Sequence, residues 1–330
     1  MSELRLNRIT GDWVIVASTR AKRPEDFIRQ PPPPPAPDYV SACPFCPGNE
    51  DFEHTHREPS EDGGWEFRIV RSKFPALEPE GEKDLLSQGL KRWMPGVGYH
   101  EVLIESPKHN TGLWDQSPFR IGTILEAMKM RYHEMIDDHR IELVVLFKNH
   151  GPSSGTSLDH PHCQIVATPL MPTDVRRRLV DAIRYFDENS ACLFCTTLAE
   201  ELSDQWRIIH KSPHFISYIP FAALSPFHTL IFPRHHSPDF GMTSKDEIQD
   251  LAVHLRLVLR KINRGLLNPD FNFVVRSLPL RAADPRCFHW YVSIIPRVSQ
   301  AAGFELGSGM YINAAIPEQS AAFLRGISIE

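Results

Sequence analysis

Two imidazoles and one amide occupy alternate positions in a short segment near the middle of the chain: His160, His162 and Gln164. Successive side chains of a β-strand point to opposite faces of a sheet, so these three would share one face of a strand. On such a face one imidazole can attack phosphorus or bind a metal, while its neighbours orient it and donate hydrogen bonds to a phosphoryl oxygen. The simpler alternative is a polar strand face near the surface that carries histidines without using them.

The segment just before this strand has the composition of a phosphate-binding loop. An apolar run over residues 141–147 leads to Asn149 and then to a stretch rich in glycine, serine and threonine that contains Gly155, Thr156 and Ser157. Backbone N–H groups and hydroxyls of such loops face anions without requiring a large net charge. We therefore expect this loop and the histidine strand to surround one phosphate together.

Four of the six cysteines form two Cys-x-x-Cys pairs, Cys43 with Cys46 and Cys192 with Cys195. The start of the chain lacks the basic and apolar regions of a signal peptide, so we expect a reducing compartment. In that setting such pairs are more often half of a zinc site than disulfides. Because zinc takes about four ligands, each pair requires two further residues.

Each cysteine pair is followed by two histidines that could complete a zinc site. His109 and His160 follow the first pair, and His236 and His289 follow the second. In both series the first histidine comes just after an apolar run and a proline. The sequence therefore predicts two zinc ions per chain, with His235 as a rival to His236. For the second pair the alternative is two buried cysteines near a helix end.

The two series of cysteines and histidines indicate a duplication. When the series are aligned, the position of His162 is occupied by Tyr291 in the second copy, and that of Gln164 by Ser293. The second copy keeps its metal ligands but lacks the reactive histidine. This asymmetry predicts one active site per chain, together with a second zinc that only stabilises the fold.

Hydrophobic periodicity predicts the elements that position these residues, and the same order of elements occurs twice. The expected strands cover residues 99–105, 142–147, 215–219, 229–232, 271–276 and 290–295. The expected helices cover residues 121–139, 173–189 and 245–264. The helix over 173–189 begins at Thr173 as its N-cap and connects the two halves. The proline-rich segment 30–38 is expected to be an extended connector that cannot join a sheet.

These elements predict an α+β fold of two tandem units, each with an antiparallel sheet and helices packed on it. We expect the two sheets to join into one continuous sheet. The expected domains are residues 1–189, which carry the reactive histidine and the first zinc site, and residues 190–330, a degenerate copy with the second zinc site.

The composition excludes several classes of protein. A chain of 330 residues with 42% apolar content can bury a large core. A formal net charge of -5 argues against a general nucleic-acid partner, because no basic field is available for a polyanion. No run approaches the ~20 apolar residues of a membrane span. We therefore expect a cytoplasmic protein that binds neither nucleic acid nor membrane.

The segment from Asn149 to Gln164 resembles the active-site segment of the galactose-1-phosphate uridylyltransferase family, the transferase branch of the histidine-triad superfamily. The resemblance continues over nearly the whole chain, through residues 6–14, 20–24, 43–46, 74–77 and 303–305. The chain is similar also to the sister ADP-glucose phosphorylases. The resemblance implies that the first cysteine and histidine series binds zinc, and we expect a homodimer.

For the chemistry, the resemblance implies double displacement on a nucleotide sugar. His162 attacks the α-phosphorus of UDP-glucose, glucose 1-phosphate leaves, and galactose 1-phosphate takes UMP from the uridylyl-histidine. Gln164 donates to a non-bridging phosphoryl oxygen, at the position where related hydrolases carry a third histidine. The residues implied to contact substrate are Arg20, Arg23, Asn149 and Ser157 at the phosphates or ribose, Phe74 near the base, and Phe304 and Glu305 toward the hexose.

Two departures from the family pattern leave the substrate open. Thr156 stands where known members have cysteine, and Ser72 stands where they have asparagine, so the ribose and base contacts differ. Adenine could replace uracil and phosphate could replace the sugar phosphate, which would make the protein an ADP-glucose phosphorylase. A zinc-stabilised nucleotide-binding protein without turnover is the alternative from another class. A dinucleoside hydrolase is disfavoured by Gln164.

Overall fold

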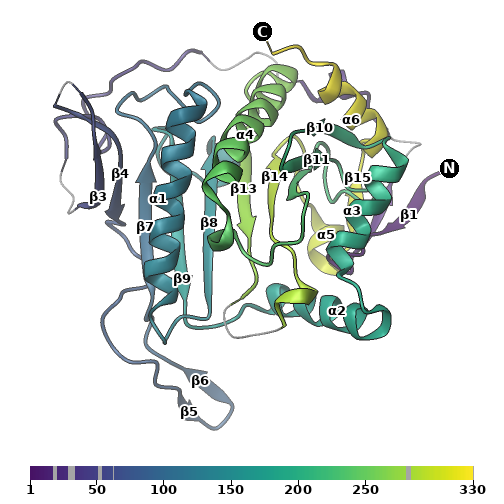
Figure 1. Ribbon diagram of the computed structural model, residues 1–330, viewed down its shortest axis with the longest axis horizontal. Helices are drawn as coiled ribbons and strands as arrows, with labels where there is room; N and C mark the ends of the chain where they lie inside the picture. Colours follow the sequence, from purple (N-terminus) through teal and green to yellow (C-terminus); the bar gives the residue numbers. More distant parts are fainter. Residues whose placement is uncertain (18–20, 29–33, 51–53, 62, 280–283, 330) are drawn as a thin grey trace.

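A ten-stranded antiparallel sheet passes through both halves of the computed structural model, which describes the chain except residues 18–20, 29–33, 51–53, 62, 280–283 and 330 (Figure 1). Its strand order is β10-β11-β12-β14-β13-β8-β9-β7-β4-β3. The first half contributes β3 (His54–Pro59), β4 (Trp65–Arg71), β7 (Tyr99–Ile104), β8 (Leu143–His150) and β9 (His162–Thr168). The second half contributes β10 (Ile208–Lys211), β11 (Phe215–Tyr218), β12 (Thr229–Pro233), β13 (Phe271–Arg276) and β14 (Tyr291–Pro296). The predicted continuous sheet is confirmed.

The strand order is symmetric about the β13–β8 pair, and the register shows which residues of the two halves correspond. Gln164 on β9 lies opposite Val102 on β7 and Phe147 on β8. Ser293 on β14 lies in the same way opposite Leu230 on β12 and Val274 on β13. Ser293 and Tyr291 therefore take the places of Gln164 and His162, as the alignment of the two series predicts.

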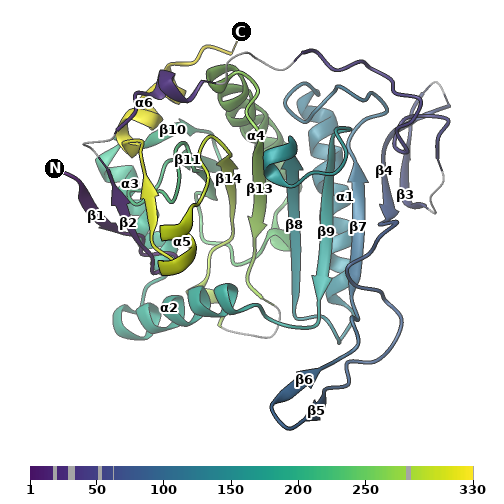
Figure 2. The same ribbon diagram turned by 180° about the vertical axis from the view of Figure 1, so that it is seen from behind.

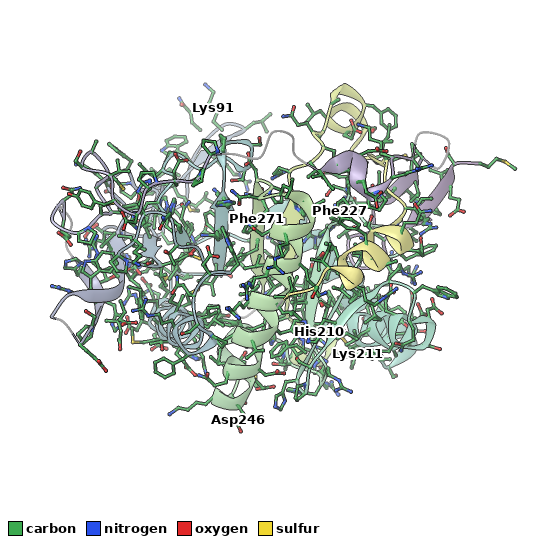
Figure 3. The ribbon with its side chains drawn as sticks, turned by 90° about the horizontal axis from the view of Figure 1, so that it is seen from above. Lys91, His210, Lys211, Phe227, Asp246 and Phe271 are labelled. Carbon is green, nitrogen blue, oxygen red and sulfur yellow. The ribbon has the colours of Figure 1, made fainter. Side chains whose placement is uncertain are left out.

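Two long helices cover one face of this sheet (Figure 1). Helix α1 (Pro118–Ile136) follows Ser117, whose hydroxyl accepts a hydrogen bond from the backbone N–H of Arg120 at 3.3 Å. Helix α4 (Lys245–Leu266) begins with a capping box between Ser244 and Glu247. The two helices pack against each other and against the strands in one hydrophobic core shared by both halves. Phe271 lies beside α4 in this core, near the middle of the molecule (Figure 3).

The opposite face of the sheet is seen in Figure 2. Because side chains alternate along each strand, every second residue points to that face. Cys163, Ile165 and Ala167 of β9 are buried under the helices. His162 and Gln164 point to the other face. The predicted alternation is therefore confirmed for His162 and Gln164. His160, which was predicted on the same strand, lies just before it, because β9 begins at His162 after Pro161.

Most of the remaining elements lie around the second half (Figure 2). They are β1 (Glu3–Leu6), β2 (Trp13–Val16), α2 (Thr173–Asn189), α3 (Leu193–Asp204), α5 (Gly303–Ser308), β15 (Tyr311–Asn313) and α6 (Pro317–Gly326). Strand β2 pairs with β15 and with β1, so the start of the chain packs near its end. The shared core and this pairing join the halves closely, and the division at residue 189 stays a prediction.

Several details differ from the sequence prediction. Helix α2 covers the predicted range, but its N-cap is Pro172 rather than Thr173, and no side chain caps it. The β3–β4 hairpin and the exposed hairpin of β5 (Leu86–Gln88) and β6 (Lys91–Trp93) were not predicted. β3, β5 and β6 are short or lack apolar alternation, whereas Trp65, Phe67 and Ile69 of β4 do alternate with charged residues and could have indicated that strand. Residues 30–33 of the predicted proline connector lie outside the described residues, and 34–37 have no regular secondary structure. In the described part of the chain, no helix is long and apolar enough to cross a membrane.

Candidate active site and metal centres

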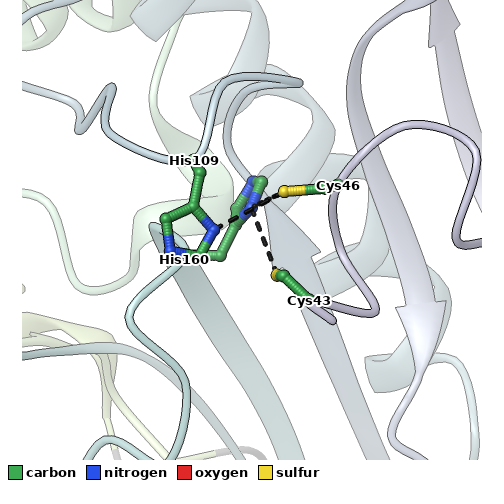
Figure 4. Close-up of side chains that lie close together, drawn as sticks. All are labelled: Cys43, Cys46, His109 and His160. Atoms are coloured by element: carbon green, nitrogen blue, oxygen red, sulfur yellow. Dashed lines mark hydrogen bonds between the residues drawn. The ribbon is translucent and has the colours of Figure 1, made fainter. Parts of the chain in front are cut away.

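The first predicted metal ligands converge at one buried point (Figure 4). The Nδ1 atom of His160 lies 3.7 Å from the sulfur of Cys43 and 3.6 Å from that of Cys46. The Nδ1 atom of His109 lies 3.5 Å from the sulfur of Cys46. Tetrahedral zinc with ordinary Zn–S and Zn–N bonds separates sulfur from nitrogen by about 3.6 Å. The four side chains therefore fit a Cys₂His₂ zinc site.

The surroundings of His160 prepare its ring for metal binding. Its Nε2 atom lies 2.8 Å from the carbonyl oxygen of Ser106, which can only accept a hydrogen bond, so Nε2 carries the proton. The Nδ1 lone pair then faces the two thiols. Burial lowers the pKa of His160 to about 4 and so keeps the ring in the neutral form that binds metals.

The second predicted metal group also assembles. The ligand atoms of Cys192, Cys195 and His236 all lie within 4.8 Å of one another. The Nδ1 atom of His289 lies 3.3 Å from the sulfur of Cys195, the same distance as the Nδ1 atom of His236. The Nε2 atom of His235 instead lies 2.9 Å from a carboxylate oxygen of Glu247, away from the cysteines, so the geometry favours His236.

The imidazole of His162 is held in one tautomer by a hydrogen bond to the backbone of His160. Its Nδ1 atom donates a hydrogen bond to the carbonyl oxygen of His160 at 2.8 Å, which leaves the lone pair on Nε2. The ring also packs against Phe45 of the cysteine loop, with 5.5 Å between ring centroids. Burial lowers the pKa of His162, so the ring is neutral and nucleophilic near pH 7. This geometry suits attack on phosphorus.

A buried ion pair that the sequence does not indicate lies behind His162. Lys148 on β8 pairs with Glu105, just after β7, and both side chains are fully buried. The ammonium group of Lys148 also donates to the carbonyl oxygen of His162 at 3.2 Å. The thiol of Cys163 donates to Glu105 at 3.1 Å. The side chains of this group connect β8, β9 and the end of β7 directly beneath His162. No sequence spacing indicates the group, because its members come from separate strands.

A second missed residue, His100, orients Gln164. The backbone N–H of Ala76 donates to Nδ1 of His100 at 3.1 Å, so the ring proton lies on Nε2. That Nε2–H donates to the Oε1 atom of Gln164 at 2.9 Å. The amide N–H groups of Gln164 therefore point away from His100 and are available to a phosphoryl oxygen. The register places His100 and Gln164 diagonally across β7 and β9.

The predicted phosphate loop is held by the second half of the molecule. Asn272 on β13 donates to the side-chain oxygen of Asn149 at 2.7 Å and to the carbonyl of Ser154 at 2.9 Å. The first bond leaves the N–H₂ group of Asn149 available to a substrate. Asp270 accepts a hydrogen bond from the backbone N–H of Ser153 at 2.7 Å. The chain segment just before β13 therefore sets the shape of this loop.

Within the loop the predicted residues differ in what they can offer. Gly155 has φ +87°, a conformation that favours glycine. The hydroxyl of Thr156 donates to the carbonyl of Leu158 at 2.9 Å, so its proton is used within the loop. Ser157 is exposed and lines a cavity of about 1080 Å³ that also borders Cys43 and His109 of the first metal group.

The other predicted contacts do not gather at His162. Arg20 lies outside the described residues. Arg23 precedes the short helix η2 (Pro24–Phe27), which packs on α6 in the other half of the molecule. Phe74 is 85% exposed in the same loop as Ala76. Phe304 and Glu305 lie on α5, beside β15 and on the far side of the second half from β9 (Figure 2). Their roles stay predictions.

Comparison with known proteins identifies the family. Residues 1–172 match the family described as galactose-1-phosphate uridyl transferase, N-terminal domain. The chain belongs to this family. It is accordingly a nucleotidyltransferase of the galactose-1-phosphate uridylyltransferase family, and its nearly full-length relatives support the same conclusion for the rest of the chain.

The relatives of this family member include two enzymes. ADP-glucose phosphorylase of Arabidopsis thaliana is 37% identical over 333 residues, covering 99% of this chain and 93% of that protein. Galactose-1-phosphate uridylyltransferase of Thermotoga maritima is 26% identical over 340 residues, covering 100% of both. The crystal structure of the Arabidopsis phosphorylase with bound ADP-glucose has a TM-score of 0.84 and 34% identity over 100% of both chains.

We expect two zinc ions per chain by metal analysis, and we expect Cys192→Ser to lose one of them. The melting temperature should fall in that variant, because a structural zinc contributes folding free energy directly. Cys163→Ser is the matched control, since it removes a buried thiol that belongs to neither metal group, and it should retain both ions. One ion per chain, unchanged by Cys192→Ser, would show that the second group is empty.

We expect Gly151→Ala to disturb the loop more than Gly155→Ala does. Both glycines have positive φ, but a Cβ at Gly151 would lie 2.1 Å from the Oδ1 atom of Asp270, whereas a Cβ at Gly155 meets nothing within 4 Å. Denaturant unfolding should show about 1–2 kcal/mol lost in Gly155→Ala from backbone strain, and about 1–3 kcal/mol more in Gly151→Ala. Equal losses would mean that Asp270 moves away freely.

Proposed function

We propose that this protein is an ADP-glucose phosphorylase, which transfers the adenylyl group of ADP-glucose to inorganic phosphate through a nucleotidyl-histidine. The observation that carries this proposal is the nearly full-length similarity to ADP-glucose phosphorylase, at 37% identity against 26% for the Thermotoga uridylyltransferase. The solved phosphorylase with bound ADP-glucose shares the fold over its whole length.

In the first step, the Nε2 atom of His162 attacks the α-phosphorus of ADP-glucose. A P–N bond forms, the bond between the α-phosphorus and the bridging oxygen breaks, and glucose 1-phosphate leaves with the electron pair of that bond. The hydrogen bond from Nδ1 of His162 to the carbonyl of His160 supports the positive charge that develops on the ring. His162 thus enters the reaction neutral and needs no separate base.

In the second step, a phosphate oxygen attacks the same phosphorus from the side opposite the Nε2 atom of His162. The P–N bond breaks, ADP forms, and His162 returns to its neutral form. Because neutral imidazole is a good leaving group from a phosphoryl-imidazolium, the exchange is reversible. No magnesium ion is required by this scheme, and all proton changes stay on His162 and on the phosphates.

Neutral hydrogen-bond donors would stabilise the charge on the non-bridging oxygens. The amide groups of Gln164 and Asn149 are oriented by His100 and Asn272, and the loop around Gly155 offers backbone N–H groups. Donors that are held in place before the reaction stabilise a transition state without reorganisation. We place Ser157 at the same phosphate and Phe74 against the base.

We propose further that zinc occupies both cysteine and histidine groups. The first group would bind zinc through Cys43, Cys46, His109 and His160, next to the nucleophile on β9. The metal supplies a rigid anchor for that strand and takes no part in the transfer. The second group, Cys192, Cys195, His236 and His289, would hold α3 to the ends of β12 and β14.

The second candidate is exchange of UMP between UDP-glucose and galactose 1-phosphate. It is favoured by the similarity to the Thermotoga uridylyltransferase, which covers the whole of both chains. Both candidates use His162 and Gln164 and form a nucleotidyl-histidine intermediate. They differ only in the base of the transferred nucleotide and in the acceptor. A homodimer stays a prediction for either.

We expect ADP-glucose alone to add the mass of one AMP group to the protein, and UDP-glucose to add a UMP group more slowly. Intact mass spectrometry without acceptor measures both. Phosphate should then remove the group as ADP. His162→Gly should form no adduct while keeping its metal content, since His162 is not a ligand.

The opposite preference, with release by galactose 1-phosphate, would establish the second candidate. No adduct with either nucleotide sugar would contradict both and favour a binding protein without turnover.

We expect His100→Ala to slow nucleotidyl transfer by roughly two- to tenfold, because one orienting hydrogen bond contributes about 0.5–1.5 kcal/mol and the freed amide loses its alignment. Gln164→Ala should slow transfer further, by about a hundredfold. The decisive measurement is a double-mutant cycle. In the Gln164→Ala background, removing His100 should change the rate little. Independent, additive losses would mean that His100 acts on the reaction by another route.

A further inference from the structure

The second half contains a small polar cavity at the place that corresponds to the catalytic face of the first half. The cavity has a volume of about 40 Å³, and its lining includes Arg178, His228, Arg276, Tyr291 and Ser293. Tyr291 and Ser293 take the places of His162 and Gln164 in the sheet register. The lost nucleophile has therefore left a cavity lined with cationic and hydrogen-bonding groups.

Two of these residues extend the correspondence between the halves. Since Leu230 corresponds to Val102, His228 just before β12 corresponds to His100. Its Nε2 atom lies 2.8 Å from the hydroxyl of Ser293, which repeats the 2.9 Å contact of His100 with Gln164. The pair that orients a phosphate donor in the first half is thus retained in the second half.

Arg276 occupies the place of Asn149. Val274 corresponds to Phe147, and Arg276 follows Val274 by two residues, as Asn149 follows Phe147. The neutral amide predicted to face a phosphate in the first half is therefore replaced by a cation in the second. Arg178 of α2 adds a second cation to the same cavity wall.

Three polar atoms of the residues that line this cavity lack hydrogen-bond partners. Among the described residues, the Nε atoms of Arg178 and Arg276 and the Nδ1 atom of His228 are buried without a hydrogen bond. Burial lowers the pKa of His228 to about 3, and the charges of both arginines act in the same direction. Burial also lowers the pKa of Arg276, with Arg178 adding to the effect and Asp174 opposing it. Unpaired buried donors are unfavourable, and an anion would accept from the Nε–H groups of both arginines. The neutral ring of His228 can donate to the same anion from Nδ1 when its Nε2 atom accepts the hydroxyl proton of Ser293.

The size of the cavity restricts the ligand. A volume of about 10–15 Å³ suffices for one water, so the cavity has room for a few oxygen atoms and not for a nucleotide. Asn7, Ile9 and Thr10 of the N-terminal segment line it and narrow it. A second cavity of about 30 Å³ adjoins it and shares Arg178, Arg276 and Tyr291.

We propose that the second half binds one phosphate-sized oxyanion between Arg178, Arg276 and His228. The site is separate from the catalytic face and does not depend on which nucleotide sugar the enzyme uses. The anion would bind to the fold built by β12, β13, β14, α2 and the N-terminal segment, so it stabilises the folded protein and not the unfolded chain.

The first test uses crystals of the full chain soaked in tungstate, a tetrahedral oxyanion with a strong anomalous signal. We expect an anomalous peak between the guanidinium groups of Arg178 and Arg276, which disappears in Arg276→Gln. An ordered water or chloride at that place in wild-type crystals soaked in tungstate would overturn the proposal.

The second test measures the melting temperature against the concentration of inorganic phosphate. Arg276→Gln and Arg178→Gln should each raise the concentration needed for half of the stabilisation by at least tenfold. Arg176→Gln is the matched control, because Arg176 is an exposed residue of the same helix; it should behave as wild type. Asn149→Ala removes a donor from the catalytic face only. The stabilisation by phosphate that depends on Arg178 and Arg276 should persist in this variant. Stabilisation that survives in both arginine variants and is lost in Asn149→Ala would assign the phosphate effect to the catalytic face and overturn the proposal.

Discussion

The hydrogen bond from His162 to the backbone carbonyl of His160 is the contact on which the site depends. It joins the proposed nucleophile to a residue whose own ring is held by two thiols and the carbonyl of Ser106. His160 lies just before β9 and His162 is its first residue, so one short segment carries both a member of the first cysteine and histidine group and the proposed nucleophile. A displacement of the loop that carries Cys43 and Cys46 would also displace His162. These cysteines contact His160, which is two residues before His162, and Phe45 of the loop packs on the His162 ring.

The symmetry of the sheet explains why one half cannot provide the site by itself. Strands β8 and β13 meet at the centre of the sheet and bring Asn149 against Asn272. The second half then holds the phosphate loop through Asp270 and Asn272, although it has lost the reactive histidine. The second half therefore supports the first, because its side chains orient groups of the phosphate loop. The single core shared by α1 and α4 gives the pair the rigidity that such alignment requires.

The two halves also show how one backbone arrangement can serve different chemistry. The histidine in β7 corresponds to the histidine just before β12, and each contacts the residue at the Gln164 position, which is serine in the second half. The second half has tyrosine in place of His162 and arginine in place of Asn149, and these residues line a narrow cationic cavity. Groups of cysteine and histidine that could hold a metal ion are present in both halves.

The sequence by itself determined the α+β class, the repeated order of elements, the two groups of cysteines and histidines and the alternation that sets His162 and Gln164 on one face. These features depend on periodicity and spacing within short segments, which the chain carries locally. The tertiary structure alone decided the roles of His100, Lys148, Glu105, Asp270 and Asn272, and the choice of His236 over His235. Those contacts join strands that are distant along the chain, and strand register, which positions them, follows from packing of the whole sheet and not from any one segment.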